Sequence, residues 1–158
     1  MFRGANNISL DSKGRITIPT RFRECLKSRC ASQLVITLDV TSRRKDNASR
    51  CLLIYPLPDW EEIERKLAKL PSLDKTVRTL QRAMQGNAMD VEMDGQGRIL
   101  VPPLLRKRAK LDKRAVLVGQ GRKFELWNEK GWDELLDECQ DIDLDRPDLP
   151  VELRKFQF

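Results

Sequence analysis

The sequence contains the pattern Asp-x-x-Gly-Arg twice, at Asp11–Arg15 and again at Asp94–Arg98. Glycine suits a tight turn, because it adopts a positive φ without steric cost. The aspartate can accept hydrogen bonds from backbone amides of the turn, or it can hold the arginine side chain. Arginine presents a planar fork that grips a phosphate, or the O6 and N7 edge of guanine. Each copy therefore predicts a hairpin tip that could enter a DNA groove.

The residues around each pattern extend this hypothesis. The first copy carries Lys13 and the second carries Gln96 at the matching position. Lysine adds positive charge, whereas glutamine can form two hydrogen bonds with adenine. Charge and nearness in the sequence add Arg3 and Arg21. The predicted DNA-binding residues are Arg3, Asp11, Lys13, Gly14, Arg15, Arg21, Asp94, Gln96, Gly97 and Arg98.

A purely structural interpretation of the same pattern stays open. The aspartate and the arginine could form a salt bridge that does no more than staple a hairpin. A single copy would favour that interpretation. Two copies, each inside a basic segment, favour the display of arginine to a polyanion.

Several other kinds of chemistry are poorly supported by the residue types. The 158-residue chain has no His, which excludes Ser-His-Asp and Cys-His catalysis. Its four cysteines form no Cys-x-x-Cys pair, so we expect reduced thiols rather than a metal site. The segment Gly95–Leu100 begins like a dinucleotide-binding loop but has Leu100 in place of the last glycine. We therefore expect no enzyme activity, no catalytic residue, no cofactor, no metal and no small-molecule substrate.

The charge of the chain is polarised. The formal net charge is +6, from 30 Lys plus Arg and 24 Asp plus Glu. Residues 129–158 contain ten acidic and four basic residues, a net of −6, so residues 1–128 carry +12. A basic body of this kind favours a polyanionic partner, nucleic acid first. A solvated surface with a solubilising acidic tail is the alternative explanation.

An internal repeat surrounds the two patterns and predicts the elements that position them. The segment 8–23 aligns without gaps on 91–106, at an offset of 83 residues. The match resumes downstream, where Tyr55 aligns with Trp127 and Trp60 with Trp132, because the polar loop 40–50 is present in the first copy alone. We expect packing rather than ligand binding from these aromatic residues.

Each copy predicts a strand, the turn, a second strand, a short helix, two further strands and a trailing helix. The first trailing helix is predicted over 59–70, with Asp59 as its cap. The second carries an apolar stripe of Trp132, Leu135, Leu136 and Cys139. A bridging helix is predicted over 73–87. Neither copy is large enough to be stable alone, so the two should share one core.

These segments closely resemble the MraZ family: MFRG with LDSKGRITIPTRFRE, then MDGQGRILVPPLLR, CLLIYPLPDWEEIERKL and LVGQGRKFELW. The resemblance covers residues 1–132. It implies an α+β fold with a mainly β core, in which two AbrB-like halves pack as a pseudo-twofold swapped-hairpin β-barrel with peripheral helices. The resulting division is 5–55 for the first AbrB-like repeat, 56–88 for a helical connector, 89–132 for the second repeat and 133–158 for an acidic tail.

The resemblance also implies a function: a sequence-specific, autoregulatory transcription regulator that binds short promoter repeats of the division and cell-wall gene cluster. It implies double-stranded DNA as partner, a ring-shaped homo-oligomer, and Arg15 as the residue that reads DNA, matched by Arg98. With neither a signal peptide nor a transmembrane run, we expect no membrane partner and a cytoplasmic, nucleoid-associated protein. A structural ring or adaptor, binding a protein through the acidic tail and the 59–70 helix, remains the alternative.

Overall fold

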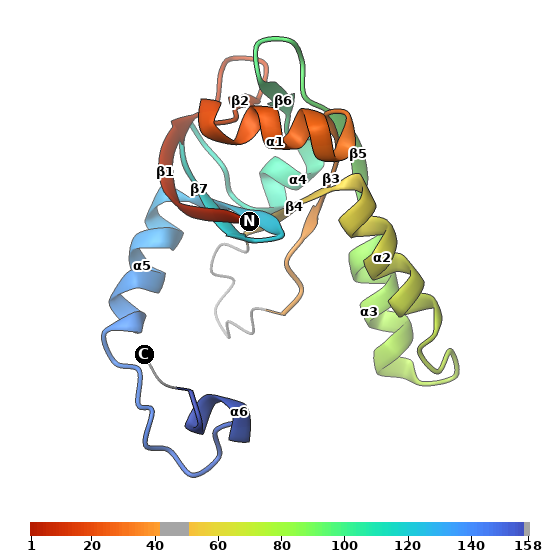
Figure 1. Cartoon of the computed structure of the whole chain (residues 1–158), viewed down its shortest axis with the longest axis vertical. Helices are drawn as coiled ribbons and strands as arrows, with labels where there is room; N and C mark the ends of the chain where they lie inside the picture. Colours follow the sequence, from red (N-terminus) through yellow and green to blue (C-terminus); the bar gives the residue numbers. More distant parts are fainter. Residues whose placement is uncertain (42–50, 157–158) are drawn as a thin grey trace.

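The structure is a computed structural model that describes residues 1–41 and 51–156. The predicted insertion at 40–50 therefore lies almost entirely outside the described residues. Strands and helices follow the order that the repeat predicts (Figure 1). The strands are β1 (Phe2–Ser9), β2 (Arg15–Thr17), β3 (Gln33–Leu38), β4 (Leu52–Pro56), β5 (Met89–Glu92), β6 (Arg98–Leu100), β7 (Arg114–Gly121) and β8 (Lys123–Asn128). The helices are α1 (Thr20–Cys30), α2 (Leu57–Ala68), α3 (Lys75–Gln85), α4 (Pro103–Arg108), α5 (Glu129–Cys139) and α6 (Val151–Arg154).

The fold is α+β, and antiparallel strands form its core. Six strands pair in the order β1-β7-β8-β4-β3-β5, while β2 and β6 form a separate two-stranded ribbon. The first strand of each copy pairs with the third strand of the other copy, β1 with β7 and β5 with β3. The central pair β4–β8 also joins the two copies. The two copies therefore share every sheet.

The fold was predicted as a swapped-hairpin β-barrel, but its main sheet does not close into a barrel. Among the described residues, the six-stranded sheet ends at β1 and β5, and these two strands do not pair with each other. Each edge strand leads into a turn, and the chain continues into the separate β2–β6 ribbon. The sheet is therefore open, with the ribbon across one of its faces. The division into repeats, connector and tail stays a prediction.

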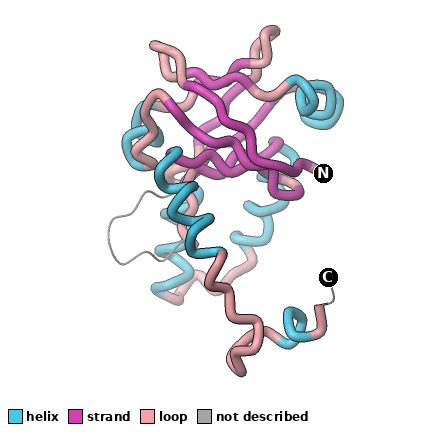
Figure 2. Tube along the Cα trace, turned by 90° about the vertical axis from the view of Figure 1, so that its left-hand side faces the viewer, coloured by secondary structure: helices cyan, strands magenta, loops and turns pink. Residues whose placement is uncertain are grey.

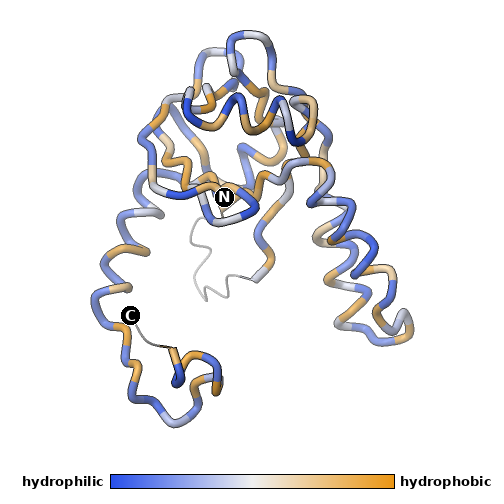
Figure 3. The backbone as a smooth tube through the Cα atoms, in the orientation of Figure 1, coloured by the Kyte–Doolittle hydropathy of each residue, from blue (hydrophilic) through white to orange (hydrophobic). Residues whose placement is uncertain are grey.

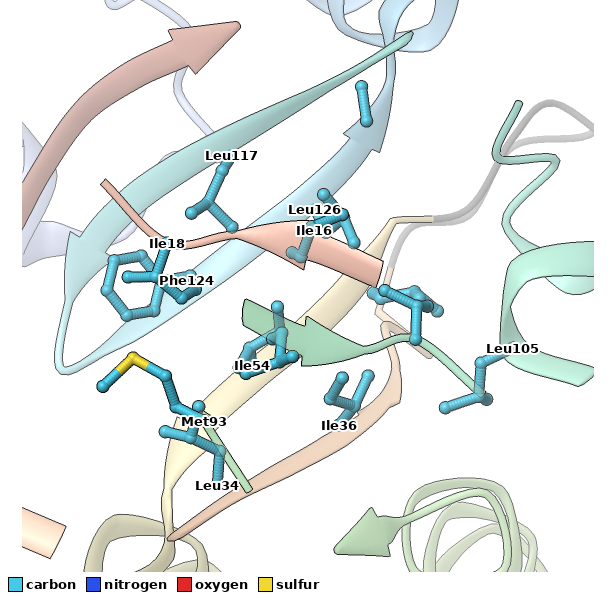
Figure 4. Close-up of a cluster of buried hydrophobic side chains, with 14 of the residues drawn as sticks. Ile16, Ile18, Leu34, Ile36, Ile54, Met93, Leu105, Leu117, Phe124 and Leu126 are labelled. Atoms are coloured by element: carbon cyan, nitrogen blue, oxygen red, sulfur yellow. The ribbon is translucent and has the colours of Figure 1, made fainter. Parts of the chain in front are cut away.

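The main core lies between the ribbon and the six-stranded sheet. Figure 4 shows Ile16 and Ile18 over Leu117, Phe124 and Leu126. Apolar residues of α1 and α4 complete this cluster, as the spacing of Phe22 and Leu26 in the sequence predicts. The short ribbon is thus held to the sheet by buried aliphatic side chains.

A second apolar cluster covers the opposite face of the sheet and holds α2, α3 and α5. Alternation along β3 sends Ile36 to the main core and Val35 to this face. The predicted aromatic packing is confirmed in both copies. The rings of Tyr55 and Trp60 are 5.7 Å apart between centroids, and those of Trp127 and Trp132 are 6.0 Å apart.

Two details of the helices differ from the sequence prediction. Pro56, not Asp59, precedes the first residue of α2, and the Asp59 carboxylate is buried instead. It accepts hydrogen bonds from Arg29 of α1 at 2.8 Å and from Arg122 Nε at 2.7 Å. These contacts join α1, α2 and the turn between β7 and β8, a role that no local pattern in the sequence encodes.

On α5, Trp132 and Leu135 pack against the sheet as predicted, but Leu136 and Cys139 are exposed. The helix runs away from the body, so its last turn has no sheet beneath it (Figure 1).

Candidate nucleic-acid interface

The two predicted turns form matching loops, named tip 1 (residues 11–15) and tip 2 (residues 94–98). In tip 1, Asp11 Oδ1 accepts hydrogen bonds from the backbone amides of Lys13 and Arg15, both at 2.9 Å. Its other oxygen, Oδ2, accepts from Arg15 Nε at 2.7 Å. Both roles that the sequence allowed for the aspartate therefore occur together.

Tip 2 repeats this geometry. Asp94 Oδ1 accepts from the amides of Gln96 and Arg98, both at 2.9 Å, and Oδ2 accepts from Arg98 Nε at 2.8 Å. The glycines have matching positive φ angles, 78° at Gly14 and 79° at Gly97. The hydrogen bonds from the arginine, its backbone amide first, hold the pKa of each aspartate below its ordinary value.

The salt bridge leaves part of each arginine accessible. The side chains of Arg15 and Arg98 are 28% and 31% exposed. In the part of the chain that the structure describes, the Nε atom alone of each guanidinium makes a hydrogen bond. The Nη groups form no hydrogen bond with the described residues, so their donors are available to a ligand. The stapling interpretation and the display interpretation are therefore compatible.

The ribbon fixes the two tips relative to one another. Ile16 lies opposite Ile99 at its centre. On either side, the amide of Ile18 donates to the Gly97 carbonyl at 2.8 Å, and the amide of Val101 donates to the Gly14 carbonyl at 3.0 Å. Figure 2 shows the tips as two separate prongs at the end of the molecule opposite the C-terminus.

Two further arginines reach the tips, and our sequence prediction missed them as site residues. The Arg106 guanidinium, from α4 of the second copy, lies against Gly14 so closely that a Cβ there would overlap it. Arg23, from α1 of the first copy, covers Gly97 in the same way, and its Nε donates to the Ile18 carbonyl at 2.8 Å. Their alignment in the internal repeat was the available signal.

The other predicted residues divide into two groups. Lys13 and Gln96 are exposed within the tips. Arg3 lies near the start of β1, eight residues before tip 1, and roughly 20 Å of strand separate it from the end of β1 at Ser9. Arg21 folds back on β1, where its Nη2 donates to Asn6 Oδ1 at 2.9 Å and to the Arg3 carbonyl at 3.2 Å. The structure therefore does not bring these two arginines to the tips.

Two negative findings hold for the described residues. They contain no group of three or more His, Cys, Asp or Glu side chains placed to hold a metal ion. None of the described helices is both long and apolar enough to cross a membrane.

Comparison with known proteins assigns the chain to a family. The family model described as "MraZ protein, putative antitoxin-like" matches residues 1–83 and again residues 84–154. The chain belongs to the MraZ family. A relative from Azotobacter vinelandii is 53% identical over 155 residues, which cover 98% of this chain and 97% of the relative.

Two further MraZ proteins with a similar sequence identity to this chain come from Pseudomonas. A relative from Pseudomonas aeruginosa (strain UCBPP-PA14) is 56% identical over 135 residues, 85% of each chain. One from Pseudomonas putida (strain F1) is 55% identical over 132 residues, 84% of this chain and 83% of the relative. All three relatives bear the name "Transcriptional regulator MraZ". The family named from the sequence is therefore confirmed.

Proposed function

We propose that this protein is a sequence-specific DNA-binding transcription regulator that contacts DNA through tips 1 and 2. The observation that carries the proposal is the paired, ribbon-linked display of two arginines on one end of the molecule. A second arginine lies against the glycine of each tip. Two such cationic loops suit the phosphates and base edges of a double helix.

The geometry suggests how each tip would work. The aspartate orients the guanidinium through Nε, which leaves two Nη groups for a bidentate contact. Arg15 and Arg98 would read bases or grip phosphates, with Asp11, Gly14, Asp94 and Gly97 shaping the loops. Lys13 and Gln96 would add contacts beside them. Arg3 and Arg21 would serve only if DNA bends along β1.

The names of the relatives support regulation of transcription by this chain. From the family resemblance we propose short promoter repeats of the division and cell-wall gene cluster as its sites, with autoregulation. We also propose a nucleoid-associated, cytoplasmic protein without catalytic activity. The pairing of each copy's first strand with the other copy's third strand supports a swapped-hairpin arrangement of AbrB-like halves.

A ring of subunits would strengthen DNA binding by the small interface of each chain. Two tips supply few phosphate contacts, so one chain should bind weakly and lose affinity steeply with salt. Several chains in one closed oligomer would place tips on successive repeats at high effective concentration.

A gel shift on DNA with one or several repeats tests the proposal. Arg15→Ala should abolish repeat-dependent binding and leave the oligomer intact. Arg65→Ala removes an exposed arginine from α2, outside the tips, and serves as the matched control. Wild-type binding by Arg15→Ala would contradict the assignment of tip 1. A protein partner retained after nuclease treatment, without DNA affinity, would favour the adaptor alternative instead.

A further inference from the structure

The C-terminal stretch that follows α5 exposes apolar side chains. Ile142 is 63% exposed and Leu144 is 45% exposed, and α6 has no buried residue. Figure 3 shows hydrophobic and hydrophilic residues alternating along this stretch, away from the body of the molecule. Apolar side chains gathered on a segment without a core indicate a surface that is covered by a partner.

The order of residues in this stretch is specific. Residues 141–145 read Asp-Ile-Asp-Leu-Asp. In the structure this stretch turns at residues 144–145, where the Asp145 amide donates to Asp143 Oδ1 at 2.9 Å. Extended against a partner, as we infer for the bound state, the same stretch would send alternate residues to opposite sides. Ile142 and Leu144 would then share one side, while Asp141, Asp143 and Asp145 line the other. Such a segment, named the tail segment, suits an apolar groove with a basic rim.

The structure has a groove of that kind beside α3. It has a volume of about 430 Å³ and lies between α3 and the end of β3. α3 buries none of its residues completely. The groove is lined by Val40, Lys75, Thr76, Thr79, Leu80 and Ala83. Its aliphatic groups match the apolar side of the tail segment.

The charge around the groove complements the tail segment. Lys75 lies in the groove, and Arg78 and Arg82 are exposed on the same helix. The tail segment carries three aspartates and no cation. Opposite charges on the rim of a contact speed association and fix its register.

The groove and the tail segment lie on opposite flanks of the molecule. Figure 1 shows α5 and the chain beyond it on one side, and α2 with α3 on the other. We propose that the α3 groove binds the tail segment of a second copy of this chain. The contact is head-to-tail, so repeating it generates a closed ring or an open filament.

This inference rests on the oligomer in the proposed function and names the parts that would build it. The contact leaves the tips uncovered, because they lie at the end of the molecule opposite the C-terminus (Figure 2). Assembly and DNA binding would therefore use separate surfaces of each copy.

Two variants of the full chain test the contact by solution mass. Ile142→Asp with Leu144→Asp alters the tail segment and leaves the groove intact. Lys75→Glu with Thr79→Glu alters the groove at two exposed positions and leaves the tail segment intact. Each variant should sediment as a single chain. Glu24→Lys with Asp90→Lys changes exposed carboxylates elsewhere and should keep the wild-type mass.

Mixing the two variants shows which copy supplies the tail segment. One intact groove and one intact tail segment remain in the mixture, so the variants should form a one-to-one pair of twice the single-chain mass. Adding Asp143→Lys and Asp145→Lys to the groove variant should restore larger assemblies. A wild-type mass for either variant would overturn the proposal, as would a mixture that stays single-chain.

The same variants separate this inference from the proposed function. The tail variant, as a single chain, should still shift DNA that carries one repeat. It should lose the higher affinity that the wild type has for DNA with several repeats. If Arg15→Ala abolishes DNA binding while both variants keep the wild-type assembly, the groove contact is wrong and the DNA-binding proposal stands. If the variants dissociate but Arg15→Ala binds DNA normally, the groove contact stands and the DNA-binding proposal is wrong.

Discussion

One carboxylate at each tip has two structural tasks. Oδ1 of Asp11 closes the turn by accepting two backbone amides, and Oδ2 aligns Arg15 through Nε. The arginine is therefore oriented without losing its two Nη groups. Because both side chains are partly exposed to solvent, the direct contribution of the ion pair to stability is small, and its main effect is to restrict the guanidinium.

The lowered pKa of Asp11 predicts a pH dependence for Asp11→Asn. Its native pKa lies below the ordinary value of about 3.9, so the unfolded chain binds the proton first as the pH falls. The charged carboxylate therefore stabilises the fold fully above that value and loses this effect as the pH drops through the native pKa. Asp11→Asn should melt below wild type at pH 7 and match it in strong acid.

Melting curves at both pH values measure this difference. Asp90→Asn, at an exposed position of β5 outside the tips, is the control and should melt as wild type does at either pH. A deficit of Asp11→Asn that persists unchanged in strong acid would show that the charge of Asp11 is not its cause.

The glycines of tip 2 supply a matched pair of substitutions. Gly97 has a φ of 79°, and a Cβ there would overlap Arg23. Gly97→Ala should therefore cost about 1–2 kcal/mol from the backbone alone and displace Arg23 from the Ile18 carbonyl. Gly95 has open space around it, so Gly95→Ala should change stability by less than about 0.5 kcal/mol.

Denaturant unfolding and DNA affinity measure both variants. Equal effects of the two substitutions would show that neither the φ angle nor the contact with Arg23 matters at tip 2.

At the scale of single residues, part of the candidate site could be predicted from the sequence. The duplicated pattern and the type of its residues predicted tips 1 and 2, because turn chemistry is local. Arg23 and Arg106 were aligned by the repeat, but their contacts cross from one copy to the other. Arg21 is the opposite case. The sequence predicted it as a DNA-binding residue, but it binds β1 instead, and this contact depends on how α1 packs.

At the scale of elements, the three-residue strands β2 and β6 hold tips 1 and 2 in place relative to one another. Each is too short to be stable alone, and the ribbon owes its position to burial of its central pair. Ile16 and Ile99 face one another and are 0% and 1% exposed. The spacing of both tips therefore depends on apolar packing rather than on the tips themselves.

Truncation of that pair should unfold the protein more easily. Ile99→Ala should cost about 2–5 kcal/mol, because it leaves a cavity in the main core. The next residue, Leu100, points outward and is 47% exposed, so Leu100→Ala should cost less than about 1 kcal/mol. Denaturant midpoints give both values, and similar costs at the two positions would contradict the assigned faces of β6.

Periodicity predicted the kind and order of these elements, because hydrophobic spacing is also local. It did not predict that Asp59 would be buried between Arg29 of α1 and Arg122 of the β7–β8 turn, because both arginines are distant in the sequence. Nor did it predict an open sheet, since strand order depends on which edges meet in space.

At the scale of the whole molecule, the internal repeat presents two tips with the same backbone turn and different charge. Both tips share the aspartate, the glycine and the arginine, but tip 1 carries Lys13 where tip 2 carries Gln96. Both of these side chains are exposed. The chain should therefore bind DNA asymmetrically, with tip 1 contributing more of the electrostatic attraction.

Reciprocal substitutions test this asymmetry through the salt dependence of binding. Each phosphate contact by a lysine contributes about −0.9 to the slope of log K against log salt concentration. For a DNA site that engages one chain, Lys13→Gln should make the slope shallower by about 0.9, and Gln96→Lys should steepen it by about the same amount. The double substitution exchanges the two side chains, so it should return the slope to its wild-type value while the preferred orientation on an asymmetric site reverses. A slope that no single substitution changes would mean that Lys13 touches no phosphate, and tip 1 would then depend on Arg15 and Arg106 for its positive charge.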